Sequence, residues 1–119
     1  MKTLMLTTLS ILAVASATAL AENRCGWIEN PTPGNYFLTD RDASWTIMTQ
    51  GGPSAEGSDL IGDLSSGDYV MTNGYYGYGC ACAEVETEES ERRITVLHSF
   101  RQIPLSRCEN DNNLGAPGQ

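Results

Sequence analysis

The chain has few positive charges. Among its 119 residues, 7 are lysine or arginine and 15 are aspartate or glutamate, which gives a net charge of −8. A chain this acidic is repelled by phosphate groups, so its composition argues against binding of nucleic acid or of anionic membrane surfaces. The same field favours a cationic partner, a protein surface or a metal ion, although an acidic surface is also an ordinary source of solubility.

Hydrolase motifs are missing as well. There is no Gly-x-Ser-x-Gly elbow, and the single histidine, His98, has no recognisable catalytic partner. No two acids are marked as a pair with separate acid and base roles. We therefore expect no enzyme activity, no catalytic residue and no cofactor.

Long apolar runs are scarce too. The one such stretch, Leu4 to Val14, is shorter than the roughly 20 residues that span a bilayer. It follows Lys2 and precedes Ala19-Leu20-Ala21, an order typical of a secretory signal peptide cleaved after Ala21. We therefore predict an exported protein, periplasmic or secreted, that is not inserted in the membrane.

Cleavage would divide the chain into three segments. We predict a signal peptide over residues 1–21, a single β domain over 22–108 and a flexible polar tail over 109–119. The mature chain would keep six arginines and all 15 acids, a net charge of −9. We expect it to be a monomer.

Four cysteines are present: Cys25, Cys80, Cys82 and Cys108. An even number in an exported chain predicts disulfides. Cys80 and Cys82 share one face of an extended segment, so they could hold Cys25 and Cys108, near the two ends of the mature chain, against one strand. A bond between Cys80 and Cys82 would strain the bond geometry, which leaves two crossed pairings open.

The middle of the chain has the pattern of strands and turns. Prolines and a glycine predict a turn at 30–35, and a hairpin follows over 36–49 with Trp45 and Ile47 on one face. Further expected segments are a loop at 50–58, an ambiguous strand or helical turn at 60–66, strands at 69–73, 80–87 and 94–103, a bend or bulge at 74–79 and a charged loop at 86–93.

Five or six short strands of this kind predict an all-β fold, a small disulfide-stapled barrel or sandwich. The bent segment before Cys80 and the long closing hairpin favour an OB-like over an SH3-like barrel.

Aromatic residues provide the candidate binding site. Trp27, Phe37 and Trp45 are predicted to lie in the core. Three tyrosines next to glycines are predicted to stand exposed on the bend, as aromatic rings with polar tips do at binding surfaces: Tyr75, Tyr76 and Tyr78.

Metal sites are the alternative. Cys80 and Cys82, with another cysteine and His98, could bind a soft metal if the thiols were reduced. The segment Asp40-x-Asp42-x-Ser44 begins like a calcium loop, but Trp45 and Gly51 stand where that loop needs glycine and glutamate, so we interpret it as a turn. We assign no metal ligand.

Several spaced motifs resemble a bacterial family known as domain of unknown function 4087. They are Cys25-Gly26-Trp27, Asn30-Pro31-Thr32-Pro33, Asn35, Leu38, Asp40, Asp42, Trp45, Ile47, Gln50-Gly51, Tyr76-Gly77-Tyr78-Gly79-Cys80-Ala81-Cys82 and Pro104-Leu105-Ser106-Arg107-Cys108. The resemblance covers nearly the whole mature chain. It implies small exported bacterial proteins that share the four cysteines, and it brings no activity.

The sequence thus predicts an exported binding or interaction module whose partner is an unknown protein or cell-envelope component. One form of it is an inhibitor of a secreted basic hydrolase such as a lysozyme. The alternatives are a periplasmic metal-binding protein that uses the Cys-x-Cys strand and a purely structural envelope component.

Overall fold

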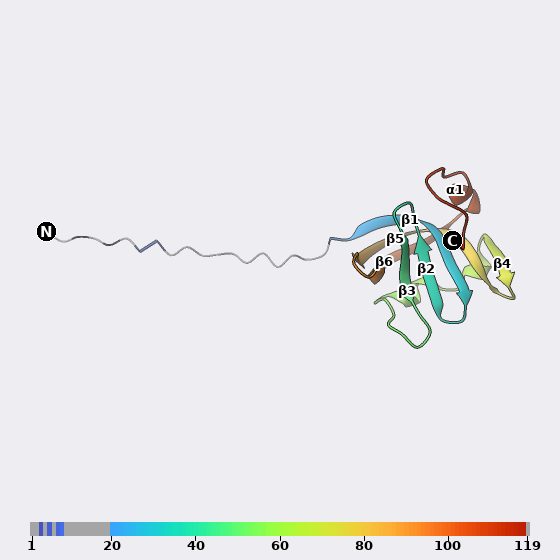
Figure 1. Ribbon diagram of the computed structural model, residues 1–119, viewed down its shortest axis with the longest axis horizontal. Coiled ribbons are helices and arrows are strands. Elements are labelled where there is room, and N and C mark those ends of the chain that lie inside the picture. Colours follow the sequence, from blue (N-terminus) through green and yellow to red (C-terminus); the bar gives the residue numbers. More distant parts are fainter. Residues whose placement is uncertain (1–2, 4, 6, 9–19, 119) are drawn as a thin grey trace.

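The computed structural model describes residues 3, 5, 7–8 and 20–118 (Figure 1). Most of the predicted signal peptide lies outside the described residues. Among the residues that are described, no helix is long and apolar enough to cross a membrane. The elements are β1 (Glu22–Thr32), β2 (Asn35–Thr39), β3 (Ser44–Met48), the 3-10 helices η1 (Ser58–Ile61) and η2 (Leu64–Ser66), β4 (Tyr69–Asn73), β5 (Tyr76–Glu88), β6 (Arg93–Ile103) and α1 (Leu105–Glu109).

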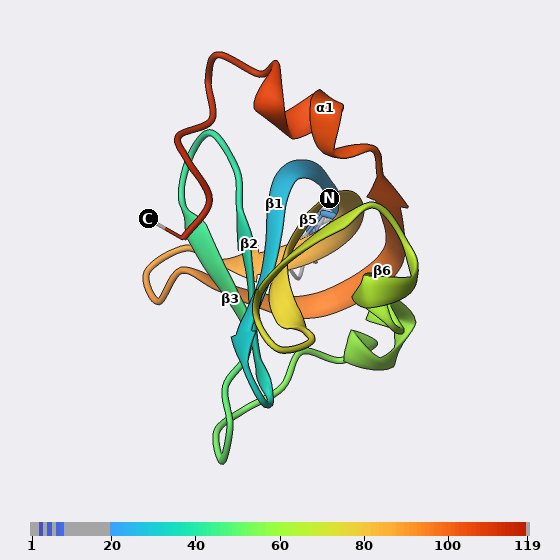
Figure 2. The ribbon, with the colours of Figure 1, turned by 90° about the vertical axis from the view of Figure 1, so that its right-hand side faces the viewer.

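The strands form one sheet in the order β1-β2-β3-β6-β5-β4, and β1 also pairs with β5. All neighbours are antiparallel except β3 and β6, which meet in parallel at Thr46 and Arg93. The pairings therefore return to β1 through β5. Figure 2 shows the curved strands β1, β5 and β6 around the interior, with α1 at one end.

The core follows the alternation of the strands. On β5, Ala81, Ala83 and Val85 are buried, as predicted for one face of that strand. Trp45 and Ile47 of β3 are buried together, which confirms their common face. A second, smaller cluster joins Trp27, Cys80 and Cys108, so the predicted core positions of Trp27 and Trp45 are confirmed.

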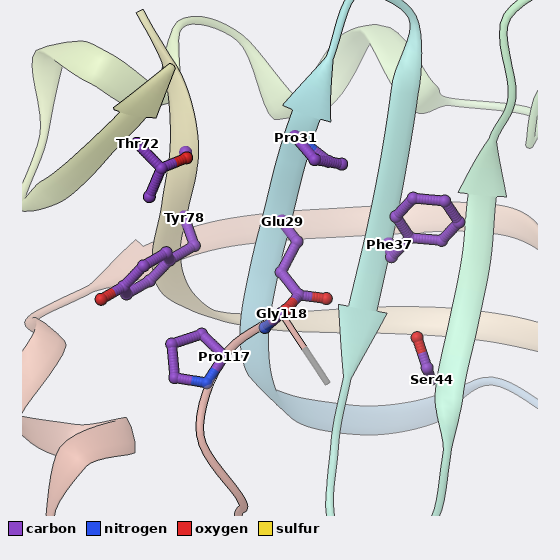
Figure 3. Close-up of a pocket in the computed structure, with 9 residues that line it drawn as sticks. Glu29, Pro31, Phe37, Ser44, Thr72, Tyr78, Pro117 and Gly118 are labelled. Carbon is purple, nitrogen blue, oxygen red and sulfur yellow. The ribbon is translucent and has the colours of Figure 1, made fainter.

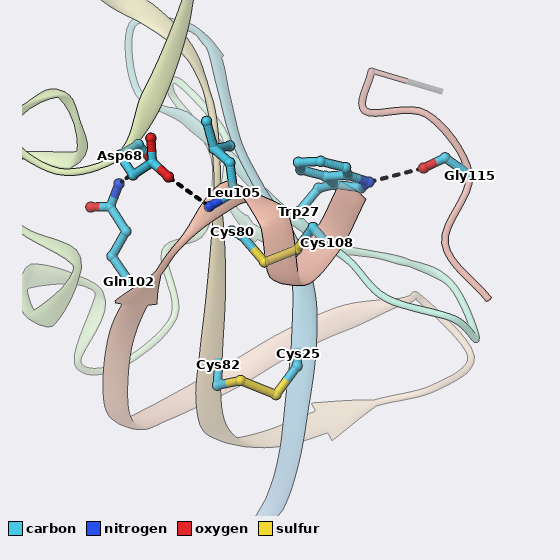
Figure 4. The surroundings of a disulfide bond; sticks show 9 residues. All are labelled: Cys25, Trp27, Asp68, Cys80, Cys82, Gln102, Leu105, Cys108 and Gly115. Carbon is cyan, nitrogen blue, oxygen red and sulfur yellow. Dashed lines mark hydrogen bonds between the residues drawn. A yellow bond between two sulfur atoms is a disulfide. The ribbon is translucent and has the colours of Figure 1, made fainter. Parts of the chain in front are cut away.

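Two disulfides fasten both ends of the domain to β5, as the cysteine spacing predicted (Figure 4). Cys25 bonds to Cys82, which lies directly opposite it on β5. Cys80 bonds to Cys108 in α1. In the chain-entropy model, loops of 57 and 28 residues contribute about 4.2 and about 3.6 kcal/mol, respectively, to the stability of the folded state.

Two predicted turns are shorter than expected. Strand β1 continues to Thr32, because the side-chain amide of Asn30 donates to the carbonyl oxygens of Thr32 and Asn35 and so stabilises a tight turn at Pro33 and Gly34. The predicted bend or bulge at 74–79 is wrong over most of its length, since β5 begins at Tyr76 and pairs with β1 from Gly77 on, and the irregularity of the β4–β5 pairing lies between Met71 and Asn73 on β4. The ambiguous segment 60–66 contains the end of the 3-10 helix η1, which begins at Ser58, and the 3-10 helix η2.

Residues beyond α1 lie along the domain. Leu114 packs on the cluster of Trp27 and Cys108, and the carbonyl oxygen of Gly115 accepts a hydrogen bond from the Trp27 indole at 2.9 Å. The amide of Gly118 donates to the carboxylate of Glu29. We predicted a mobile tail in this stretch from its polar composition, which gave no sign of these contacts.

Candidate functional site

One cross-strand row contains the best candidate site. Tyr78 on β5 lies opposite Glu29 on β1, and Glu29 lies opposite Phe37 on β2. Side chains that face each other across neighbouring strands stand on the same side of the sheet and contact one another. The row therefore places a carboxylate between two aromatic rings, as Figure 3 shows.

This row forms one side of a cavity of about 380 Å³, which is within the size range of small-ligand sites. The remaining lining comes from separate parts of the chain: Pro31, Ser44, Thr72, Gly77, Pro117 and Gly118. We call this cavity the aromatic groove. Through Pro117 and Gly118, the C-terminal segment forms one wall of the groove. Two hydrogen bonds hold this segment in place, one between Trp27 and Gly115 and one between Gly118 and Glu29.

Glu29 is the charged side chain that lines the groove, and its residue is only 7% exposed. Its Oε2 accepts a hydrogen bond from the hydroxyl of Thr39 at 3.0 Å, and its Oε1 accepts one from the amide of Gly118. Both donors are neutral. Among the described residues, no arginine or histidine forms an ion pair with Glu29.

The other buried carboxylate, Asp40, has a different environment. Arg24 Nη1 lies 2.7 Å from its Oδ2, and the Trp45 indole donates to its Oδ1 at 3.0 Å. Burial alone would raise the pKa of Asp40, but these bonds and those from the amides of Ala43 and Asp42 hold it below its ordinary value. Hence Asp40 is fully engaged within the fold, whereas Glu29 is not.

A family model described as "Protein of unknown function (DUF4087)" matches residues 19–115. The chain belongs to this family. No curated protein and no solved structure matches it. The match extends past Cys108 and takes in Leu114, which packs on the Trp27 cluster, and Gly115, which accepts the hydrogen bond of the Trp27 indole, in this DUF4087 protein.

The structure separates the three tyrosines predicted to bind. Tyr78 lines the groove and packs edge-on against Trp27, with ring centroids 5.4 Å apart. Tyr75 stands in the β4–β5 turn and is 77% exposed. Tyr76 is half-buried; burial, and after it the neighbouring Tyr76, raise the pKa of Tyr36. In this DUF4087 protein only Tyr78 therefore belongs to the groove.

The residues that the sequence suggested as metal ligands have partners within the fold. All four cysteines are in disulfides, so a thiolate metal site would require these bonds to be reduced. His98 pairs with Glu86 on the exposed side of the β5–β6 hairpin at 2.7 Å. Asp40 Oδ1 accepts from the amides of Asp42 and Ala43, which confirms the turn that we inferred in place of a calcium loop.

Sequence reasoning missed Glu29 and misplaced Phe37. We expected Phe37 in the core, but it is half-buried and lines the groove. One signal was present in the alternation of side chains along each strand. Phe37 lies on the opposite face of β2 from the buried Leu38, and Glu29 lies on the opposite face of β1 from the buried Ile28. This alternation does not show the strand register, which places β1 between β5 and β2 in this DUF4087 protein.

Proposed function

We propose that this protein is an exported binding module that captures a protein or envelope component at the aromatic groove. The observation that carries the proposal is the cavity of about 380 Å³ in which Tyr78 and Phe37 flank Glu29. Aromatic rings around one oriented polar group are the usual make-up of a recognition site. Two disulfides are compatible with a periplasmic or extracellular location.

The strand pairings support a more specific fold. We propose that β1, β2, β3, β6 and β5 close into a small OB-like barrel, since each pairs with the next and β5 pairs again with β1. In OB-folds the second and third strands contribute to the binding face. Phe37 and Ser44 come from the second and third strands here, which supports a site on this side of the barrel.

The first experiment measures capture of a partner from the native envelope. The oxidised protein is immobilised, the retained component is identified, and its affinity is measured for the wild type and for Phe37→Ala. We expect at least a tenfold loss for Phe37→Ala, because truncating a central aromatic contact commonly costs more than about 1.4 kcal/mol. A variant with wild-type affinity would contradict the assignment of the groove.

Tyr75→Ala is the matched control, because Tyr75 is aromatic and exposed but lies outside the groove lining. We expect it to bind like the wild type. If Tyr75→Ala alone loses the partner, the contact surface is the β4–β5 turn. Absence of any saturable partner would favour the purely structural envelope component.

The inhibitor form of the proposal has a direct test. A mature charge of −9 attracts a basic enzyme over a long range. We expect a stoichiometric excess of the oxidised protein to reduce lysis of cell-wall substrate by at least one lysozyme type. Undiminished lysis by every type tested would remove this form and leave the binding module to the capture experiment.

A further inference from the structure

We propose that the aromatic groove binds a basic side chain of the partner, arginine in preference to lysine, with Glu29 as the counter-ion. This inference rests on the proposed function and names the chemical group that the groove recognises. The partner is therefore a protein or peptide that presents an exposed arginine.

Glu29 has no cationic partner among the described residues. Buried charges in proteins are paired, because an isolated charge loses its hydration without compensation. Asp40 obeys this rule through Arg24, but Glu29, equally buried, has among the described residues only the hydroxyl of Thr39 and the amide of Gly118 as donors. A cation supplied by a binding partner would neutralise the carboxylate of Glu29.

The carboxylate of Glu29 has hydrogen-bonding capacity left over. A carboxylate offers about four lone-pair positions, and each oxygen of Glu29 uses one of its two for the donors already named. One position is left on each oxygen. Two parallel N–H groups of a guanidinium match such a pair of acceptors, whereas an ammonium is a point charge without this fork.

Aromatic side chains flank Glu29 in the groove. The rings of Tyr78 and Phe37 stand on the two sides of the carboxylate and line the same cavity (Figure 3). Aromatic faces attract cations, and a guanidinium plane stacks on them. Among the described residues, the groove lining contains no arginine, lysine or histidine that would repel an incoming cation.

The experiment titrates defined peptides into the oxidised, isotope-labelled protein. The probes are acetyl-Gly-Gly-X-Gly-Gly-amide with X as arginine, lysine or citrulline, the neutral and nearly isosteric relative of arginine. We expect the arginine peptide to shift the amide signals of Glu29, Tyr78 and Gly118 in a saturable way. Lysine should bind more weakly, and citrulline at least about tenfold more weakly, since a charge-assisted bond is lost.

Two variants locate the charge that matters. Glu29→Gln should lower the affinity for the arginine peptide at least about tenfold. Glu84→Gln removes the same charge from an exposed position on β5, outside the groove, and should bind like the wild type. Amide spectra of both variants show whether the fold is kept, and the citrulline comparison on the wild type decides the matter even if Glu29→Gln does not fold.

Equal binding of the citrulline and arginine peptides, or signal shifts confined to residues outside the groove, would overturn the inference. So would an unchanged affinity of a folded Glu29→Gln. These failures can be told apart from failure of the proposed function. If the Glu29→Gln variant still captures the envelope partner and the Phe37→Ala variant does not, the protein uses the groove without an arginine contact.

Discussion

Trp27 and Gly115 are joined by a hydrogen bond across 88 positions of the chain, from the indole nitrogen to the carbonyl oxygen at 2.9 Å (Figure 4). The same indole packs edge-on against Tyr78, and Leu114 lies in its cluster. Trp27 therefore positions both a ring of the groove and the segment that forms its wall.

Replacing Trp27 by phenylalanine should release that segment. The variant keeps an aromatic ring but loses the indole donor and part of the packed volume, so we expect the free energy of unfolding to fall by about 2 kcal/mol. The amide of Gly118 should also exchange faster with solvent. Hydrogen exchange followed by mass spectrometry measures this, with the β6 amides as internal reference, and unchanged protection of Gly118 would contradict the assignment.

The two disulfides should differ in their sensitivity to reductant. Cys80 and Cys108 are 1% and 3% exposed, whereas Cys25 is exposed and Cys82 half-buried. Because thiol–disulfide exchange needs access to a sulfur, a low concentration of reductant should open Cys25–Cys82 first. Timed alkylation and peptide mapping give the order, and prior alkylation of Cys80 and Cys108 would refute it.

Gly77 should not tolerate a side chain. A Cβ atom at Gly77 would lie 1.8 Å from the carbonyl oxygen of Val70 on β4, a backbone atom that cannot move alone. We expect Gly77→Ala to destabilise the protein by about 3 kcal/mol or to detach β4, because overpacking forces the backbone apart. The control is Gly115→Ala, whose Cβ meets nothing within 4 Å. Denaturant unfolding compares the two variants, and equal midpoints would contradict the prediction.

Acid should weaken the fold through Asp40. Its folded-state pKa lies below the ordinary value of 3.8, so the ionised form contributes stability that is complete above that value and is lost as the pH falls through the lower, folded-state pKa. Asp40→Asn keeps one carbonyl acceptor but cannot titrate. Unfolding free energies measured from pH 6 downward should therefore fall less steeply for Asp40→Asn than for the wild type, and parallel curves would exclude Asp40 as the source.

Residue spacing was sufficient to predict much of the fold. Cys80 and Cys82 predicted that both ends of the domain are tied to one strand, and Trp45 with Ile47 predicted a buried face. The choice between the two crossed pairings needed the register that sets Cys25 opposite Cys82. No local pattern carries that register, because it depends on which strands become neighbours.

The glycines near Cys80 show why the site was harder to predict than the fold. We expected glycine to leave Tyr76 and Tyr78 free of neighbours, but Gly77 is required by the close approach of Val70 on the next strand. Tyr78 consequently lies in a strand beside Glu29, and the groove arises where the consecutive strands β1 and β2 meet β5, which is distant from them in sequence.

The pairing of β1 with β5 also governs when this domain can fold. Residues 22–30 bond to residues 77–85, so the earliest strand has its central partner only after some fifty further residues are available. The β2–β3 hairpin needs only neighbours and can form early, whereas the sheet cannot be completed until late. In a chain that crosses a membrane amino end first, β1 would therefore emerge before β5 is available to pair with it. The Cys25–Cys82 disulfide could form only after β5 has followed, so its formation would mark the pairing of β1 with β5.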